Sequence, residues 1–115
     1  MTYTMQNLDA TFSALSDPTR RAILSRLAAG EATVMELVQP FSMSQPAVSR
    51  HLRVLEEAGL ITRRVEGAKR PCRLAPGGIA EIDGWLDVLR KALETNYARL
   101  DKVLASQKKA RKDKP

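Results

Sequence analysis

Hydrophobic residues recur at helical spacing along most of this chain, beginning near its N-terminus. Leu8 and Phe12 lie four residues apart and predict an amphipathic helix that ends near Ser16. The segment "DPTRR" then begins a second helix, with Asp17 as its N-cap and a proline in its first position. Gly30 is a suitable C-terminal stop for that helix. The first 30 residues are therefore predicted to form two short helices.

The next apolar positions predict two further helices separated by a tight turn. Thr33 and Glu36 have the spacing of a capping box, and Pro40 is expected to break the short helix that follows. Ser44 then caps another helix, which runs to about residue 58 and ends at Gly59. Such a pair of helices with a short connection is typical of a helix-turn-helix.

Beyond Gly59 the spacing of apolar residues changes to two, and it later returns to the helical period. Apolar and polar positions alternate on both sides of "EGAKR", which predicts a β-hairpin with Gly67 in its turn. From about Ile79 to Leu104, leucines at near-heptad spacing predict one long helix. The fold class is therefore mainly α with a small β-hairpin wing, a winged helix-turn-helix in the order α-α-α-α-β-β-α.

The helix over residues 44–58 has two faces of different character. Val48, Leu52 and Leu55 lie on one side, which must face the core. The other side carries short hydrogen-bonding side chains near its start and two arginines one turn later. Side chains of these types can reach base edges in the major groove of DNA. This face and its flank present Gln45, Pro46, Ser49, Arg50, Arg53 and Glu57.

The positive charge of the chain is concentrated where this interpretation needs it. The chain carries a formal net charge of +6, and residues 44–73 hold seven basic and three acidic side chains. Within the hairpin, Arg63, Arg64, Lys69 and Arg70 are predicted to contact the sugar–phosphate backbone beside the recognition helix. The predicted partner is double-stranded DNA.

Two segments, "ALSDPTRRAILSRL" and "MSQPAVSRHLRVLEEAGLI", together with the basic hairpin, closely resemble the ArsR family of winged-helix bacterial repressors. The resemblance covers about residues 8–104. It implies a homodimer that binds an imperfect inverted repeat in a promoter, with its own promoter as one candidate. The DNA-contacting positions of the family fall here on Ser44, Gln45, Pro46, Ser49, Arg50 and Arg53.

The resemblance places the dimer interface on the first and last helices, in agreement with the long apolar stripe. That stripe is too long for so small a core to cover, so a second copy is expected to bury it. The predicted interface residues are Leu8, Phe12, Ile82, Trp85, Leu86, Leu89, Leu93, Tyr97 and Leu100.

The chain departs from the metal-sensing members of the family. Their Cys-Val-Cys pair is replaced here by "TVMEL", and the last helix contains no histidine to bind zinc. We therefore expect no metal site and no cofactor, and the best match is the branch without metal ligands, similar to SdpR-type autorepressors. Nucleophile–base pairs, phosphate-binding loops and cofactor motifs are missing as well, so an enzyme is not expected.

Two residues and one functional class leave alternatives open. His51 is expected to contact a DNA phosphate or to pack with one hydrogen bond. Cys72 is either an inert strand cysteine or, because basic residues surround it, a redox-sensitive thiol that switches the repressor. A dimeric interaction module that does not bind DNA is the other alternative, although it would leave the polar face of the 44–58 helix unexplained.

The organisation and location of the chain are also predicted. Residues 1–106 are expected to form one DNA-binding and dimerisation domain, and the basic residues 107–115 a disordered tail. The N-terminus does not resemble a signal peptide and no apolar run is long enough to span a membrane, so a bacterial cytoplasmic protein is expected.

Overall fold

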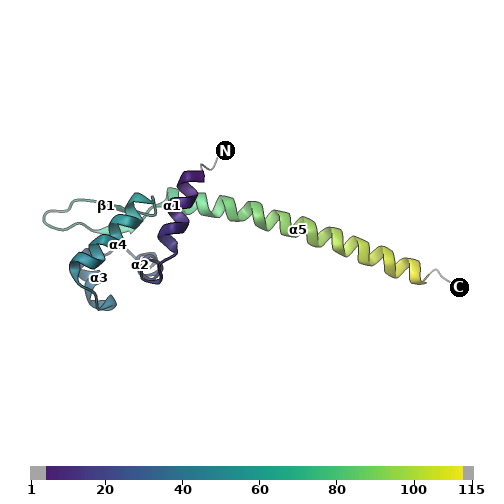
Figure 1. Ribbon diagram of the computed structural model, residues 1–115, viewed down its shortest axis with the longest axis horizontal. Coiled ribbons are helices and arrows are strands. Elements are labelled where there is room, and N and C mark those ends of the chain that lie inside the picture. The colour runs from purple at the N-terminus through teal and green to yellow at the C-terminus, as the bar shows by residue number, and fades with distance from the viewer. Residues whose placement is uncertain (1–4, 113–115) are drawn as a thin grey trace. The chain divides into compact units, whose positions relative to one another are not determined.

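The computed structural model describes the backbone of residues 5–112 and the side chains of residues 8–108. Its helices are α1 (Met5–Leu15), α2 (Pro18–Ala28), α3 (Val34–Phe41), α4 (Gln45–Glu57) and α5 (Pro76–Lys112), and its strands are β1 (Ile61–Arg63) and β2 (Cys72–Leu74), as Figure 1 shows. This order confirms the predicted winged helix-turn-helix. The chain divides into two compact units, the first ending at Ile82 and the second beginning at Asp83.

The predicted helix caps are present. The Asp17 carboxylate accepts a hydrogen bond from the Arg20 N–H at the start of α2, and Thr33 and Glu36 form both hydrogen bonds of a capping box at the start of α3. Each of these bonds satisfies an N–H that has no partner within its helix. The first turns of α2 and α3 are therefore set by residues adjacent in sequence.

The end of α3 differs from the prediction. Pro40 was expected to break this helix, but it lies inside α3, one residue before the end. A proline this close to the C-terminus removes only one backbone hydrogen bond. The helix ends instead where Ser42 adopts a left-handed conformation, with a φ of 50°. The turn to α4 is therefore made by Ser42.

The core of the first unit is aliphatic and centres on α4. Val48, Leu52 and Leu55 are completely buried, as their spacing predicted. α4 packs against α1, α2, α3 and β1, and Figure 1 shows these elements gathered in one cluster. Because four elements hold its buried side, the orientation of the opposite side of α4 is fixed.

The wing is short and gains a third segment that was not predicted. β1 and β2 are antiparallel, with Ile61 opposite Leu74. Cys72 also pairs with Ala32, through two backbone hydrogen bonds of 2.8 and 3.1 Å. With three residues in each strand, Val65 lies outside the sheet and is 74% exposed, although it belongs to the apolar–polar alternation that predicted the hairpin. The Ala32 pairing ties the base of the hairpin to the loop before α3.

Two glycines bring the beginning of α5 close to the end of α4. Gly59 ends α4 with a φ of 76°. A Cβ atom on Gly78 would lie only 2.0 Å from the Gly59 carbonyl oxygen. The Ala75 N–H donates a 2.9 Å hydrogen bond to the Leu60 carbonyl nearby. Gly78 is therefore required where the two helices approach each other, and any side chain there would displace one of them.

α5 is longer than the sequence pattern predicted. It begins at Pro76 rather than near residue 79, and it continues to Lys112 through the first part of the segment expected to be a disordered tail. Gln, Lys, Ala and Arg are good helix formers, and basic side chains near a helix C-terminus interact favourably with its dipole. Residues 113–115 of the predicted tail lie outside the described residues.

Candidate nucleic-acid interface

The N-terminus of α4 is capped by a side chain. The Ser44 hydroxyl accepts a 3.3 Å hydrogen bond from the Ala47 N–H, and Pro46 occupies the first turn, where its missing N–H has no cost. Gln45 and Pro46 are both exposed. The backbone at this end of α4 is therefore accessible, and the small residues allow a ligand to approach it closely.

The exposed side of α4 presents two arginines without protein partners. Arg50 and Arg53 are exposed, and neither has a hydrogen bond or ion pair recorded within residues 8–108. Ser49 lies half-buried between them and Gln45. Unpaired guanidinium groups on a rigid helix are available for bidentate contact with an external acceptor such as a guanine edge or a phosphate.

His51 lies on the side of α4 that faces α1 and α2. Its Nδ1 atom is 3.4 Å from Nη1 of Arg20, and Arg20 also donates hydrogen bonds to the carbonyls of Ala14 (2.7 Å) and Ser13 (3.2 Å) at the end of α1. Through this arginine, His51 joins three helices. Of the two roles expected for His51, the packing role with one hydrogen bond matches this position.

Arg20 and its neighbour Arg21 were not singled out from the sequence. Arg21 donates a 2.7 Å hydrogen bond to the Leu15 carbonyl, so both arginines of "DPTRR" bind carbonyls at the C-terminus of α1. Carbonyls at a helix end have no partner within the helix and attract cations. The position of two arginines just after a predicted helix end was a signal that could have been used.

The basic residues of the wing fall into two classes. Lys69 and Arg70 are exposed at the turn, and within the described residues their side chains have no recorded ion pair. The turn itself is closed by two backbone hydrogen bonds between Glu66 and Lys69, of 2.9 and 3.0 Å. These two side chains are available to an external anion, as is that of Arg73 on β2, which is exposed and donates a hydrogen bond to the Thr62 hydroxyl.

Arg64 is occupied by two carboxylates. Both terminal nitrogens of its guanidinium donate hydrogen bonds to Glu31, with Nη2 at 2.7 Å from Oε1. Nη2 also lies 2.9 Å from Oε2 of Glu66. The hydrogen bond from Arg64 lowers the pKa of Glu31 below its ordinary value of 4.5. This pair is therefore intact at neutral pH and weakens only as the pH falls through that lowered pKa. Glu31 lies 33 residues away in sequence, so no local pattern indicated it.

Arg63 is partly enclosed between the wing and α4. Only 18% of its side chain is exposed, and its Nε atom lies 3.6 Å from Oε1 of Glu56. This nitrogen is buried and has no hydrogen-bond partner. Arg63 therefore connects the base of the wing to the last turns of α4 through an ion pair.

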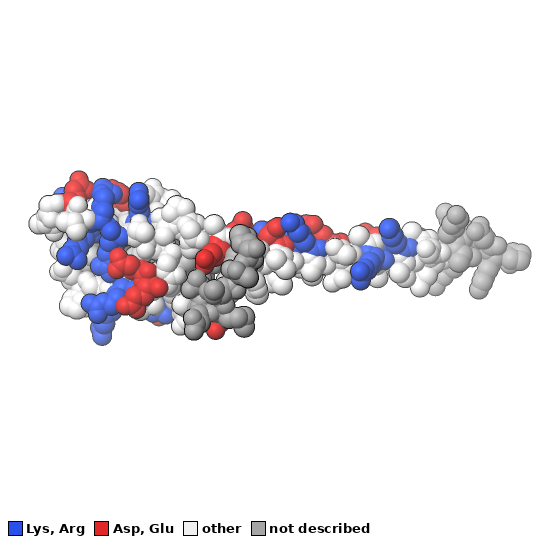
Figure 2. Space-filling view, turned by 90° about the horizontal axis from the view of Figure 1, so that it is seen from above, with Lys and Arg blue, Asp and Glu red and all other residues white. Residues whose placement is uncertain are grey.

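Two of the predicted recognition residues and the wing line one common hollow. It has a volume of about 350 Å³ and lies between the start of α3, the start of α4 and the turn of the wing. Gln45 and Ser49 line it from α4, and Lys69 and Arg70 from the wing. Figure 2 shows Lys and Arg side chains gathered over part of the first unit, with acidic side chains among them. The fold thus places Gln45 and Ser49 of α4 next to Lys69 and Arg70 of the wing.

Met35 was missed by the sequence reasoning. It lies in the first turn of α3, is 64% exposed and lines the same hollow. An exposed methionine at this place is an apolar contact point beside polar groups. In the sequence, Met35 is an apolar residue that lies off the apolar stripe of α3, and this was the available signal.

The predicted dimer residues differ in exposure. Leu8 is buried, with 8% exposure, whereas Phe12 is 39% exposed. Ile82 and Trp85 are half-buried. The remaining predicted residues of α5 are exposed by 37 to 63%, and these are Leu86, Leu89, Leu93, Tyr97 and Leu100.

Cys72 is enclosed by the core. Its side chain is fully buried, and burial raises the pKa of the thiol above its ordinary value of 9.0. The basic residues near it in sequence had suggested a lowered pKa, but desolvation outweighs the opposing influence of Arg63. A thiol of this kind is unreactive, because the thiolate is the nucleophile.

Two further features concern metals and membranes. Among the side chains of residues 8–108, no three of the His, Cys, Asp and Glu type lie together in an arrangement able to hold a metal ion. Across the described part of the chain, every helix is too short or too polar to cross a membrane.

Comparison with known proteins places this architecture in a family. The profile of the "Bacterial regulatory protein, arsR family" matches residues 17–63, which extend from the cap of α2 to the end of β1. The HTH-type transcriptional regulator Rv2034 of Mycobacterium tuberculosis is 42% identical over 97 residues, covering 84% of this chain and 91% of that protein. The transcriptional repressor SdpR of Bacillus subtilis is 38% identical over 60 residues, or 52% of this chain and 67% of SdpR.

Solved structures support the same family assignment. The crystal structure of an ArsR family transcriptional regulator, RHA00566, has a TM-score of 0.73 and 37% identity, covering 82% of this chain and 97% of that one. The homodimeric winged helix-turn-helix DNA-binding domain of Mb0332 from Mycobacterium bovis has a TM-score of 0.63 and 26% identity, covering 76% and 81%. The chain therefore belongs to the ArsR family of bacterial regulatory proteins, and it is a DNA-binding transcriptional regulator.

Proposed function

We propose that the protein is a homodimeric repressor that binds an inverted-repeat operator in duplex DNA. The exposed side of α4 carries the proposal: Arg50 and Arg53 extend from a rigid helix and have no partner among the described side chains. A helix of this kind reads base edges when it lies in the major groove, with Gln45 available for adenine and the arginines for guanine.

The wing supplies contacts that do not depend on the DNA sequence. Lys69 and Arg70 at the wing turn approach the phosphates beside the groove that α4 occupies. Arg63 and Arg64 stabilise the wing through carboxylates of the protein itself. They support DNA binding by positioning Lys69 and Arg70.

Dimerisation is what makes an inverted repeat readable. The exposed leucines of α5 form an apolar face that a second copy would bury, and the Mb0332 domain is a homodimer. A two-fold axis places two copies of α4 in major grooves about 34 Å apart, one helical turn of DNA. The operator therefore has two related half-sites. A role as a cytoplasmic repressor of its own promoter follows the same family pattern.

Two alternatives make different predictions. Redox control through Cys72 requires an accessible thiolate, and the buried thiol with its raised pKa opposes it. An interaction module that ignores DNA would leave Arg50 and Arg53 without a function. The related proteins are transcriptional regulators rather than enzymes.

The direct test is selection from a random duplex library by the full-length protein. The expected result is enrichment of an inverted repeat whose half-site centres are about 10 base pairs apart. Enrichment of no sequence, or of a single half-site without a repeat, would contradict the proposal.

A further inference from the structure

The second unit carries an apolar face with one polar interruption. Between residues 83 and 104, the side chains of α5 that fall within an arc of about 120° on a helix with 3.6 residues per turn are apolar or aromatic except Asn96. Leu93 on one side of Asn96 is 52% exposed and Leu100 on the other is 54% exposed. Asn96 therefore lies within a surface that is otherwise suited to burial, between Leu93 and Leu100 along the helix.

The spacing within this face alternates between three and four residues. The positions that follow this rule are Leu86, Leu89, Leu93, Asn96, Leu100 and Val103. This alternation is the core pattern of helices that pack along one another with knobs in holes. A second copy of the same helix has the matching pattern, whereas an unrelated flat surface does not.

The charges of α5 leave this face uncharged. Arg90 pairs with Asp83 at 3.1 Å and with Asp87 at 3.7 Å, and Lys91 pairs with Asp87 at 3.0 Å. These four residues lie outside the apolar arc, and each charge is balanced within its own helix. A charged partner would therefore find no complement on the face, which favours an identical, uncharged one.

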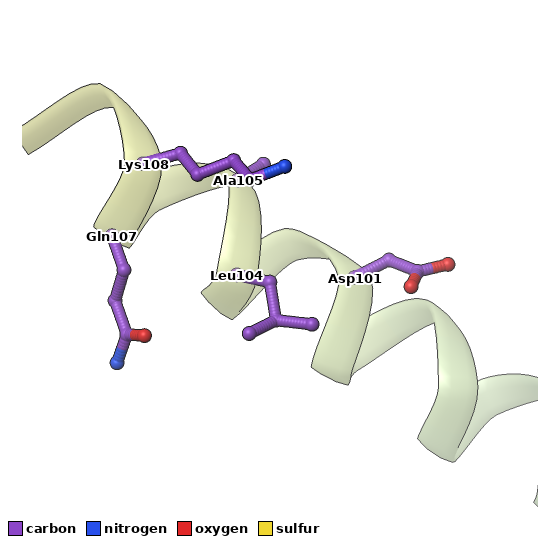
Figure 3. A pocket seen from close by; sticks show the side chains of 5 residues that line it. All are labelled: Asp101, Leu104, Ala105, Gln107 and Lys108. Atoms are coloured by element: carbon purple, nitrogen blue, oxygen red, sulfur yellow. The ribbon is translucent and has the colours of Figure 1, made fainter. Parts of the chain in front are cut away.

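The apolar face continues toward the C-terminus. Figure 3 shows Leu104 and Gln107 projecting to one side of α5, while Asp101 and Lys108 project in another direction. Together with Ala105 these side chains surround a shallow depression lined by one helix alone. The face thus remains open to a partner as far as Gln107.

We propose that this face packs along α5 of a second copy and that Asn96, buried there, fixes the register of the two helices. The inference rests on the homodimer proposed above and adds the residue that specifies its geometry. A buried carboxamide needs a hydrogen-bond partner. In one register the partner helix supplies that hydrogen bond, and a slipped register would place Asn96 against leucine. The polar group therefore lowers stability and selects a single alignment.

Replacement of Asn96 by leucine tests this assignment. In the full-length protein, Asn96→Leu is expected to raise the melting temperature by about 4 °C or more and to weaken binding to the selected operator several-fold, because slipped registers move the two copies of α4 out of spacing. Thr95→Leu is the matched control, since Thr95 lies outside the apolar arc of α5 and its hydroxyl donates a hydrogen bond to the Lys91 carbonyl of the same helix. If Asn96→Leu has the same melting temperature as the wild type, or is stabilised without loss of operator affinity, the assignment is overturned.

A second variant keeps the test independent of folding effects. Asn96→Asp places a charge in the face and should dissociate the dimer in sedimentation velocity, whereas Thr95→Asp should not. If the wild type is dimeric and Asn96→Asp remains so, the role of Asn96 fails and the homodimer stands. If the wild type itself sediments as a monomer, the homodimer is refuted as well.

Discussion

Four arginines, which lie in α4, in β1 and directly after β1, differ in what they contact, and their functions differ accordingly. Arg50 and Arg53 have no recorded protein partner within the described residues, whereas Arg63 and Arg64 are paired with carboxylates. A guanidinium that already donates to a carboxylate has fewer N–H groups and less uncompensated charge to offer a phosphate. At this scale the free arginines are the ones suited to contact DNA, and the paired ones position the wing.

Arg64→Ala and Glu31→Gln test the positioning role. Both variants break the same pair, so both should lower affinity for operator and scrambled DNA by a similar, few-fold factor in anisotropy titrations. Arg99→Ala, which removes one charge from α5, is the control for net charge. If Glu31→Gln binds as tightly as the wild type or more tightly, Arg64 acts as a direct phosphate contact instead.

The thiol of Cys72 should be unreactive in the folded protein. Because its thiol is buried and its pKa is raised, a thiol reagent should modify it slowly in buffer and rapidly in denaturant. Peroxide at concentrations that leave the fold intact should not change DNA binding. Fast stoichiometric modification of the native protein would reopen the redox alternative.

At the scale of elements, local chemistry determines most of what the sequence predicted. Caps such as Asp17 and Ser44 and the apolar spacing of α4 act over a few residues, and their helices were predicted with nearly correct bounds. The Glu31–Arg64 pair and the Ala32–Cys72 bridge join residues far apart in sequence. No local pattern encodes them, because they exist only once the loop before α3 has met the wing.

The same distinction applies to α5 and to the candidate site. The heptad spacing of α5 predicted a helix, but the basic residues after position 106 were predicted to form a disordered tail although their helix propensity is high. Gln45, Arg50 and Arg53 could be selected from the wheel of α4. The internal partners of Arg63, Arg64 and His51 could not, because they depend on how the helices and wing pack.

The junction of α4 and α5 gives a prediction about stability. Gly78→Ala should lower the free energy of unfolding by about 1–3 kcal/mol, because its Cβ would collide with the Gly59 carbonyl. Gly77→Ala is the control: no atom lies within 4 Å of a Cβ at that position, and alanine favours the helix. Denaturant titration compares the two, and equal stability would mean that the helices do not approach so closely.

For the whole molecule, the distribution of charge predicts how binding depends on salt. Residues 44–73 and residues 107–115 each carry an excess of positive charge, whereas the rest of the chain carries a slight excess of negative charge, and a dimer doubles both basic blocks. Each phosphate neutralised on binding releases counterions, so log K should fall steeply and linearly with log[salt]. Removal of residues 107–115 should reduce the slope and the affinity for random DNA. Binding that barely changes between low and physiological salt would contradict an electrostatic interface.

The central claim is that the exposed side of α4 reads the operator sequence. The most direct measurement is the ratio of affinities for operator and scrambled duplex, by anisotropy at one fixed salt concentration, for the wild type, Arg50→Ala and Arg70→Ala. Arg50→Ala should lose discrimination by about 1–3 kcal/mol, whereas Arg70→Ala should weaken both duplexes alike. If Arg50→Ala lowers both affinities equally and keeps the wild-type ratio, α4 does not read the sequence.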